Sequence, residues 1–193
     1  MPKNTQVYII EYKVENGFIS KAISLVTGQK YSHTAMVIGN TWYELDAIDE
    51  YKGEPDYHKK EYKNIDDFLL NNPEKERTEA YWVPWIFNRK QIVKMEAWWD
   101  NKIISGQKYG YAKLISFLPY MILKRIYRAF NKPYSPKFDI VKQDVCSVAV
   151  DTNVTKVGGY DMIPNSPERF TYPGLAAHYL REYHYEAKTE NVV

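Results

Sequence analysis

The order of apolar and polar residues changes character within the first thirty positions. Residues 6–13, QVYIIEYK, are rich in β-branched and aromatic side chains and predict a strand. Residues 18–26, FISKAISLV, instead place their apolar side chains on one face of a helix. Thr27 and Gly28 then end that helix, because glycine readily takes the conformation that follows a last helical turn. The chain therefore starts with a strand followed by a helix.

The next apolar runs predict a β-hairpin. The first strand covers 32–38, the turn 39–41 and the second strand 42–47. Asn40 suits the turn, because asparagine tolerates the positive φ that short hairpin turns require.

The middle of the chain predicts a loop, a strand and two helices. Residues 48–64 are charged and rich in turn formers, which indicates a surface loop. A short helix is expected at 65–72 with Asn64 as its N-cap, and a strand at 79–85. Apolar residues at three- and four-residue steps predict a longer helix over 89–104.

The second half is mostly helical in pattern. A helix is expected near 111–118, and residues 117–130 are both apolar and basic, with Pro119 bending or dividing the run. The segment around Cys146 fits a strand by its β-branched content and a helix by its apolar spacing, so both remain open. Residues 165–170, NSPERF, predict a helix start with serine as the cap and proline at the first helical position. This order predicts an α+β fold in which a small antiparallel sheet or half-barrel packs against helices.

Composition narrows the class of protein. The chain has 193 residues, which suits one domain, and a net charge of +2, which gives no strong attraction to nucleic acid. Its single cysteine forms no intrachain disulfide, and this favours a reducing compartment. The sequence shows no signal peptide and no apolar run of membrane-spanning length, so we expect a cytoplasmic protein.

Cys146 is the candidate nucleophile. A thiol attacks a carbonyl group as the thiolate, which a neighbouring imidazole or the first turn of a helix favours. If the segment after Cys146 is helical, the sulfur lies in that first turn. No histidine lies within twenty residues of it, so the imidazole comes from elsewhere, and His33 in the hairpin is the best candidate.

Two acids on the second hairpin strand could orient the His33 ring. A two-residue turn pairs Ile38 with Thr41, which places Asp46 opposite His33 and Glu44 diagonal to it. Longer turns move His33 further from Glu44. Residues 44 and 46 share a face of the strand, so both acids remain candidates.

Three motifs in order resemble a known family. The stretches SHTAMVIG, WYELDA and, about a hundred residues later, DVCSVAVD are similar to the circularly permuted papain-like cysteine hydrolases, which are related to the NlpC-type peptidases. The YiiX-like branch has the same order of histidine, acid and cysteine. Here His33, Glu44 and Cys146 match those three positions, so the resemblance selects Glu44 as the first candidate and leaves Asp46 as the second.

The resemblance implies one papain-like α+β domain over residues 1–193. His33 would act as general base and acid, Glu44 would orient it, and Cys146 would form an acyl-enzyme with a peptide-like or other amide substrate. No metal or cofactor is implied. A related branch, similar to lecithin-retinol acyltransferase, moves acyl chains between lipids, and a binding module without turnover is the third alternative.

Other residues carry weaker expectations. Tyr31, Tyr109 and Tyr111 are candidates for the lining of a substrate pocket. Residues 117–138 look like a basic and aromatic insertion or a lid, and 117–130 would suit contact with a membrane surface.

The other three histidines are expected at the surface. His58 lies in the charged loop, and His178 and His184 lie in a helix-like tail. His178 remains a minor alternative as the base, in the order of the unpermuted enzymes.

Overall fold

The computed structural model describes six stretches of the chain and a few positions between them. The stretches are 5–14, 18–46, 56–71, 75–110, 144–164 and 171–185, and the further positions are 119, 122, 123, 126, 127 and 130. All statements below concern these residues.

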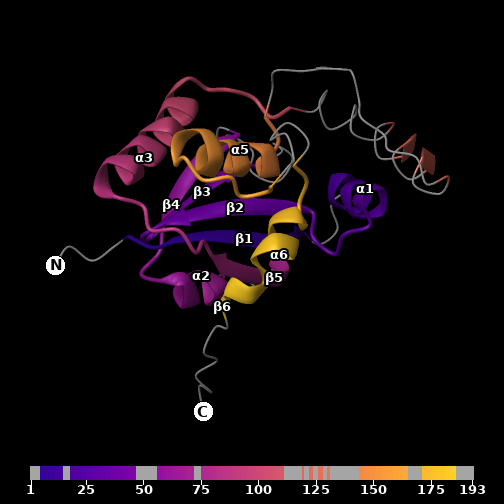
Figure 1. The fold of residues 1–193 in the computed structure, drawn as a ribbon, viewed down its shortest axis with the longest axis horizontal. Helices are drawn as coiled ribbons and strands as arrows, with labels where there is room; N and C mark the ends of the chain where they lie inside the picture. The colour runs from indigo at the N-terminus through magenta and orange to yellow at the C-terminus, as the bar shows by residue number, and fades with distance from the viewer. Residues whose placement is uncertain are drawn as a thin grey trace, which may run out of the picture.

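A six-stranded antiparallel sheet forms the centre of the fold (Figure 1). Its strands are β1 (Val7–Val14), β2 (His33–Ile38), β3 (Thr41–Leu45), β4 (Tyr57–Glu61), β5 (Lys75–Trp82) and β6 (His184–Tyr185). Their order across the sheet is β4-β3-β2-β1-β5-β6, and every neighbouring pair is antiparallel. This confirms the predicted α+β class with an antiparallel sheet.

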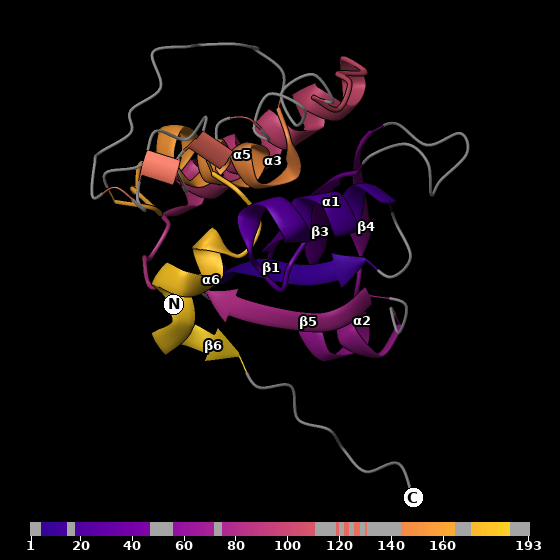
Figure 2. The ribbon, with the colours of Figure 1, turned by 90° about the vertical axis from the view of Figure 1, so that its right-hand side faces the viewer.

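Helices lie on both faces of the sheet. They are α1 (Phe18–Thr27), α2 (Ile65–Asn71), α3 (Arg89–Ile104), α5 (Cys146–Thr152) and α6 (Leu175–Leu180). A π-helical segment, Asn153–Val157, continues α5, and a 3₁₀ turn, Arg181–Tyr183, follows α6. Figures 1 and 2 show α3 and α5 together on one side of the strands and α2 on the other.

Alternating residues of the strands divide the core into two clusters. In β1, Val7 and Ile9 pack with the side chains of α3, α5 and α6, whereas Ile10 and Tyr12 pack on the side of α2. Trp99 of α3 is fully buried in the first cluster. Burial of these apolar side chains is the main favourable term that holds the helices on the sheet.

Several local predictions are confirmed. The strand 6–13, the helix 18–26 and the hairpin appear as β1, α1 and β2–β3, and the helix 89–104 appears with the same bounds as α3. Asn64 caps α2, because its Oδ1 accepts the backbone N–H of Asp67 at 2.8 Å.

The ambiguity around Cys146 is resolved in favour of a helix. All six residues from 146 to 151 are buried, so apolar side chains surround the helix and blur its period. The β-branched valines that suggested a strand fill space between the sheet and α3.

Two predictions along the chain are wrong. Residues 57–61 of the expected loop 48–64 form β4, which pairs with β3, and His184 of the expected helical tail lies in β6. Strand β5 also begins at Lys75, earlier than the expected 79. Both misplaced strands lie at the edges of the sheet, where one side faces solvent and an apolar pattern is weak.

Three expectations lie outside the described residues. These are the helix near 111–118, the helix start at 165–170 and, apart from its few described positions, the insertion or lid at 117–138.

Candidate active site

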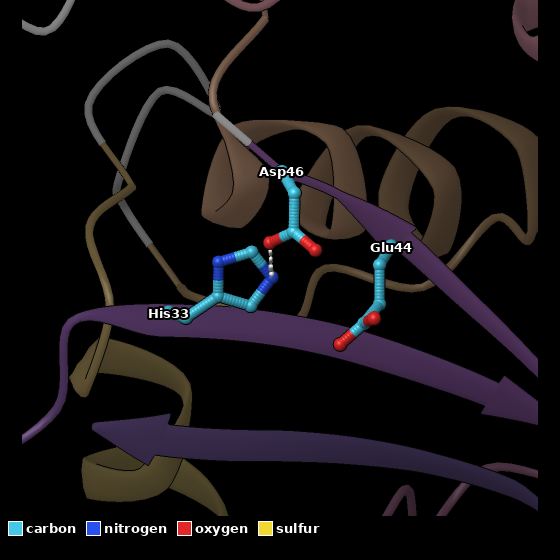
Figure 3. Close-up of side chains that lie close together, drawn as sticks. All are labelled: His33, Glu44 and Asp46. Atoms are coloured by element: carbon cyan, nitrogen blue, oxygen red, sulfur yellow. Dashed lines mark ion pairs between the residues drawn. The ribbon is translucent and has the colours of Figure 1, made fainter. Parts of the chain in front are cut away.

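His33 lies at the first position of β2, next to the C-terminal end of β3. Its ring stacks at an angle on that of Tyr12 in β1, with the ring centroids 4.7 Å apart. The residue is 6% exposed, and its Nε2 lies 3.3 Å from Oδ1 of Asp46 (Figure 3). Burial, the tyrosine ring and the carboxylate therefore hold the imidazole in one orientation.

The hairpin register explains why Asp46 reaches the histidine. Ile38 pairs with Thr41, so the turn has two residues, and Gly39 supplies its positive φ of 62°. This is the register that the sequence predicted to bring Asp46 opposite His33. Asp46 follows the last residue of β3 and is held there by a hydrogen bond from its N–H to the carbonyl of Asp56.

Glu44 lies close to His33 but has other partners. It is 4% exposed, its Oε1 accepts the hydroxyl of Tyr12 at 2.6 Å, and its Oε2 lies 3.0 Å from Nε2 of His58. The carboxylate that pairs with His33 in this structure is thus that of Asp46, the second candidate. Glu44 instead contacts Tyr12 and His58.

Cys146 is the first residue of α5, in the first helical turn as the helical interpretation required. Asp144 fixes the approach to this turn, since its Oδ2 accepts bonds from Tyr57 on β4 and Lys102 on α3, both at 2.8 Å. The sulfur comes from late in the chain and His33 from early in it, yet the two side chains lie close enough for Cys146 to raise the pKa of His33.

The pKa of His33 is raised to about 9 by this environment. Burial is the largest single influence and lowers the pKa, but the negative charge of Asp46, the interaction with Cys146 and the charge of Glu44 together outweigh burial. The imidazole therefore carries a proton at neutral pH, next to a thiol and a carboxylate.

His58 is the residue of this cluster that the sequence did not reveal. It was expected on an exposed loop, but it lies on β4 directly opposite Glu44. Its pKa is raised, because the hydrogen bond and charge of Glu44, followed by the charge of Asp46, outweigh its burial. The stretch YHKKE gives no alternating signal for this strand, because only Tyr57 is buried and the last three residues are exposed.

The same cluster offers metal-ligand atoms. One atom from each of His33, Glu44 and Asp46 lies within 4.8 Å of the others, and imidazole with carboxylate is a ligand set that zinc accepts. Both carboxylates already contact imidazoles at 3.0–3.6 Å, and Tyr12 donates to one of them. The two imidazoles, whose pKa values are raised, thus place positive charge beside both carboxylates without a metal ion.

The candidate pocket tyrosines are buried where they are described. The hydroxyl of Tyr31 lies 3.3 Å from that of Tyr81, and the N–H of Tyr109 donates to Asp56 at 2.5 Å. Tyr111 lies outside the described residues.

Two hollows among the described residues lie away from the cluster. One of about 350 Å³ is lined by Trp82, Trp85 and Tyr183 among others, and a smaller one lies beside Trp42 and Phe68. Cys146 itself is 1% exposed, so its side chain has almost no contact with solvent in this structure.

The two remaining histidines do not join the cluster. His178 is exposed on α6, and His184 lies on the edge strand β6 with its Nε2 3.9 Å from a carboxylate oxygen of Glu79.

Comparison with protein-family models, with curated proteins and with solved structures gave no match. Among the described residues, no helix combines the length and the apolar character needed to cross a bilayer.

Proposed function

We propose that this chain is a cysteine hydrolase that cleaves amide bonds of peptide-like substrates, with a permuted papain-like arrangement of its site. The observation that carries the proposal is the close approach of Cys146 to His33, whose Nε2 also lies 3.3 Å from Oδ1 of Asp46. A nucleophile, a base and an orienting acid in contact are the parts that this chemistry needs.

The reaction follows from these roles. The Cys146 thiolate attacks the carbonyl carbon of the amide, and the tetrahedral intermediate collapses when His33 gives its proton to the leaving amine. This leaves a thioester on the sulfur. His33 then takes a proton from water, the resulting hydroxide attacks the thioester carbonyl, and the C–S bond breaks to release the acid product and restore the Cys146 thiolate beside protonated His33.

Asp46 would keep the His33 ring in place and stabilise its charged form through the Nε2 contact of 3.3 Å. Glu44 would support this arrangement through the hydrogen bond that it accepts from Tyr12, whose ring packs on that of His33. In the resemblance to the permuted family Glu44 has the orienting role, so the two acids give different expectations that substitution can separate.

The test is detection of the acyl-enzyme by intact mass. The wild-type chain and Cys146→Ser are incubated with a panel of amides and esters, and the mass of each chain is followed over time. We expect an adduct on the wild type that decays with release of the acid product. If no member of the panel gives an adduct that depends on Cys146, the proposal is wrong.

A second candidate function is acyl transfer to or from lipids. It is favoured by five large apolar side chains between positions 122 and 130 that are 38–71% exposed: Ile122, Leu123, Ile126, Tyr127 and Phe130. Aromatic and aliphatic side chains of this kind, in a segment that also carries lysine and arginine, suit the surface of a bilayer. Release of labelled acyl chains from phospholipid vesicles, lost in Cys146→Ala, would select this function over amide hydrolysis.

The burial of Cys146 favours a third candidate, a binding module that lacks turnover. In that case a small alkylating reagent would modify Cys146 no faster than a model thiol near neutral pH.

A further inference from the structure

We propose that His58 is a positioning residue of the site, which neutralises Glu44 and holds Asp46 so that Asp46 orients His33. This inference rests on the proposed cysteine chemistry. His58 Nε2 lies 3.0 Å from Glu44 Oε2 and 3.6 Å from Asp46 Oδ2, so it contacts both acids. The contacts thus form a continuous chain across four strands, from Tyr12 through Glu44, His58 and Asp46 to His33.

Charge balance explains why a second imidazole is needed. Two carboxylates stand near one ring that must alternate between neutral and charged forms during the reaction. With both acids uncompensated, the cluster would favour the charged form of His33 too strongly and would repel a thiolate on Cys146. A protonated His58 cancels one of the two negative charges.

The position of His58 on the sheet suits this role. Backbone pairing of β3 with β4 places it directly opposite Glu44, and its side chain is 17% exposed, which lets solvent exchange its proton. The titratable groups that the structure places around this pair of histidines are Tyr12, Glu44, Asp46, Cys146 and Glu11, whose pKa is lowered by the charge of His33.

The experiment measures alkylation of Cys146 by iodoacetamide as a function of pH, which needs no knowledge of the substrate. His58→Gln retains a side-chain N–H but has no charge, and His58→Phe retains a ring without either. We expect both variants to shift the alkylation midpoint upward by about 0.5–1 pH unit, because the field at the sulfur becomes more negative. The rate at the plateau should fall several-fold in His58→Phe and stay near that of the wild type in His58→Gln.

Lys59→Gln is the matched control. It removes one positive charge from the next residue of the same strand, where Lys59 pairs with Asp100 of α3 at 2.8 Å, and it should leave the profile unchanged. Thermal unfolding of each variant identifies loss of fold, and if His58→Phe does not fold, the midpoint of His58→Gln decides.

The outcomes separate this inference from the proposed function. If His33→Asn alters the pH profile while His58→Gln and His58→Phe match the wild type, His58 has no positioning role and only this inference is overturned. If His33→Asn itself leaves the wild-type profile unchanged, the proposed cysteine chemistry fails. A shift in Lys59→Gln equal to that in His58→Gln would show a general charge effect and would also overturn the inference.

Discussion

At the scale of single residues, the candidate site depends on which carboxylate controls His33. Asp46 has the largest influence among the charges that raise its pKa, and Glu44 the smallest. This agrees with the geometry, since Asp46 contacts the ring while Glu44 contacts Tyr12 and His58.

Substitution of the two acids should therefore have unequal effects. In Asp46→Asn the pKa of His33 should fall well below 9, because its closest negative charge is gone, whereas in Glu44→Gln it should fall less. NMR titration of the histidine Cε1–H resonances, assigned with His33→Asn, measures both. A larger fall in Glu44→Gln would return the orienting role to Glu44.

A second buried acid, Glu11, predicts a change in stability with pH. Burial raises its pKa to about 8, although Thr34 and the backbone N–H groups of Gly174 and Ala177 partly oppose the rise. The folded state keeps this proton while the unfolded chain loses it near 4.5, so the free energy of unfolding falls as pH rises from about 4.5 through 8.

Glu11→Gln should remove that dependence. We expect the variant to melt at a higher temperature than the wild type at pH 8–9 and at nearly the same temperature at pH 4–5, because glutamine stays neutral throughout. Thermal unfolding followed by circular dichroism across this range gives the comparison. An equal difference between the two proteins at both ends of the range would contradict it.

At the scale of elements, the position of α5 depends on an anchor between α3 and β4. Asp144 accepts hydrogen bonds from Tyr57 and Lys102, and also from Gln107 at 3.2 Å. Its side chain is 14% exposed, so these bonds are shielded from water.

Loss of this anchor should destabilise the fold. Asp144→Ala is expected to lower the free energy of unfolding by about 1–3 kcal/mol, since a charged acceptor is removed and its donors lose their partner. Asp100→Ala, which breaks the exposed pair with Lys59, should cost less than about 1 kcal/mol. Urea unfolding measures both, and equal losses would mean that Asp144 is no anchor.

Among the elements, α3 and the β2–β3 hairpin could be predicted from the sequence, whereas β4 could not. Helix α3 is amphipathic over sixteen residues, and a capping box between Asn88 and Gln91 starts it, so its bounds follow from local pattern. The β2–β3 hairpin follows from its turn, and with it the approach of Asp46 to His33. Strand β4 was missed because YHKKE is charged, and its pairing with β3 depends on contacts across the sheet.

In the candidate site, too, local sequence patterns identify some residues, while others depend on pairing across the sheet. His33 and Cys146 were identified as candidates from their motifs, and Asp46 from strand parity. His58 could not be identified, because the segment before β4 leaves its register with Glu44 open and only the folded sheet sets it.

At the scale of the whole molecule, the buried titratable groups together make the folded state most stable in weakly acidic solution. Glu11 and His33, with pKa values of about 8 and 9, and His58, whose pKa is also raised, bind protons more tightly in the folded chain. Stability from His33 is complete below about 6.5 and is lost as pH rises through 9, and the raised pKa of His58 acts in the same direction. All three groups therefore lower the free energy of unfolding on the alkaline side.

Glu79 acts on the other side of the profile. Although burial raises its pKa, hydrogen bonds from Lys30, Tyr31 and Tyr81 outweigh burial and lower it to about 2. Its stabilising contribution is complete above 4.5 and is lost as pH falls through 2.

The melting temperature should therefore be highest near pH 4.5, where Glu79 is ionised and Glu11 still keeps its full contribution, and should fall toward pH 9. The net charge of +2 at pH 7 is small, so general repulsion between charges does not drive this profile, and the buried groups do. Melting in buffers from pH 3 to 10 at constant ionic strength tests it, with Glu11→Gln and His58→Gln each expected to flatten part of the alkaline fall. A melting temperature that stays level or rises from pH 6.5 to 9 would mean that the folded chain does not hold these protons, and the charge balance inferred for the site would fail with it.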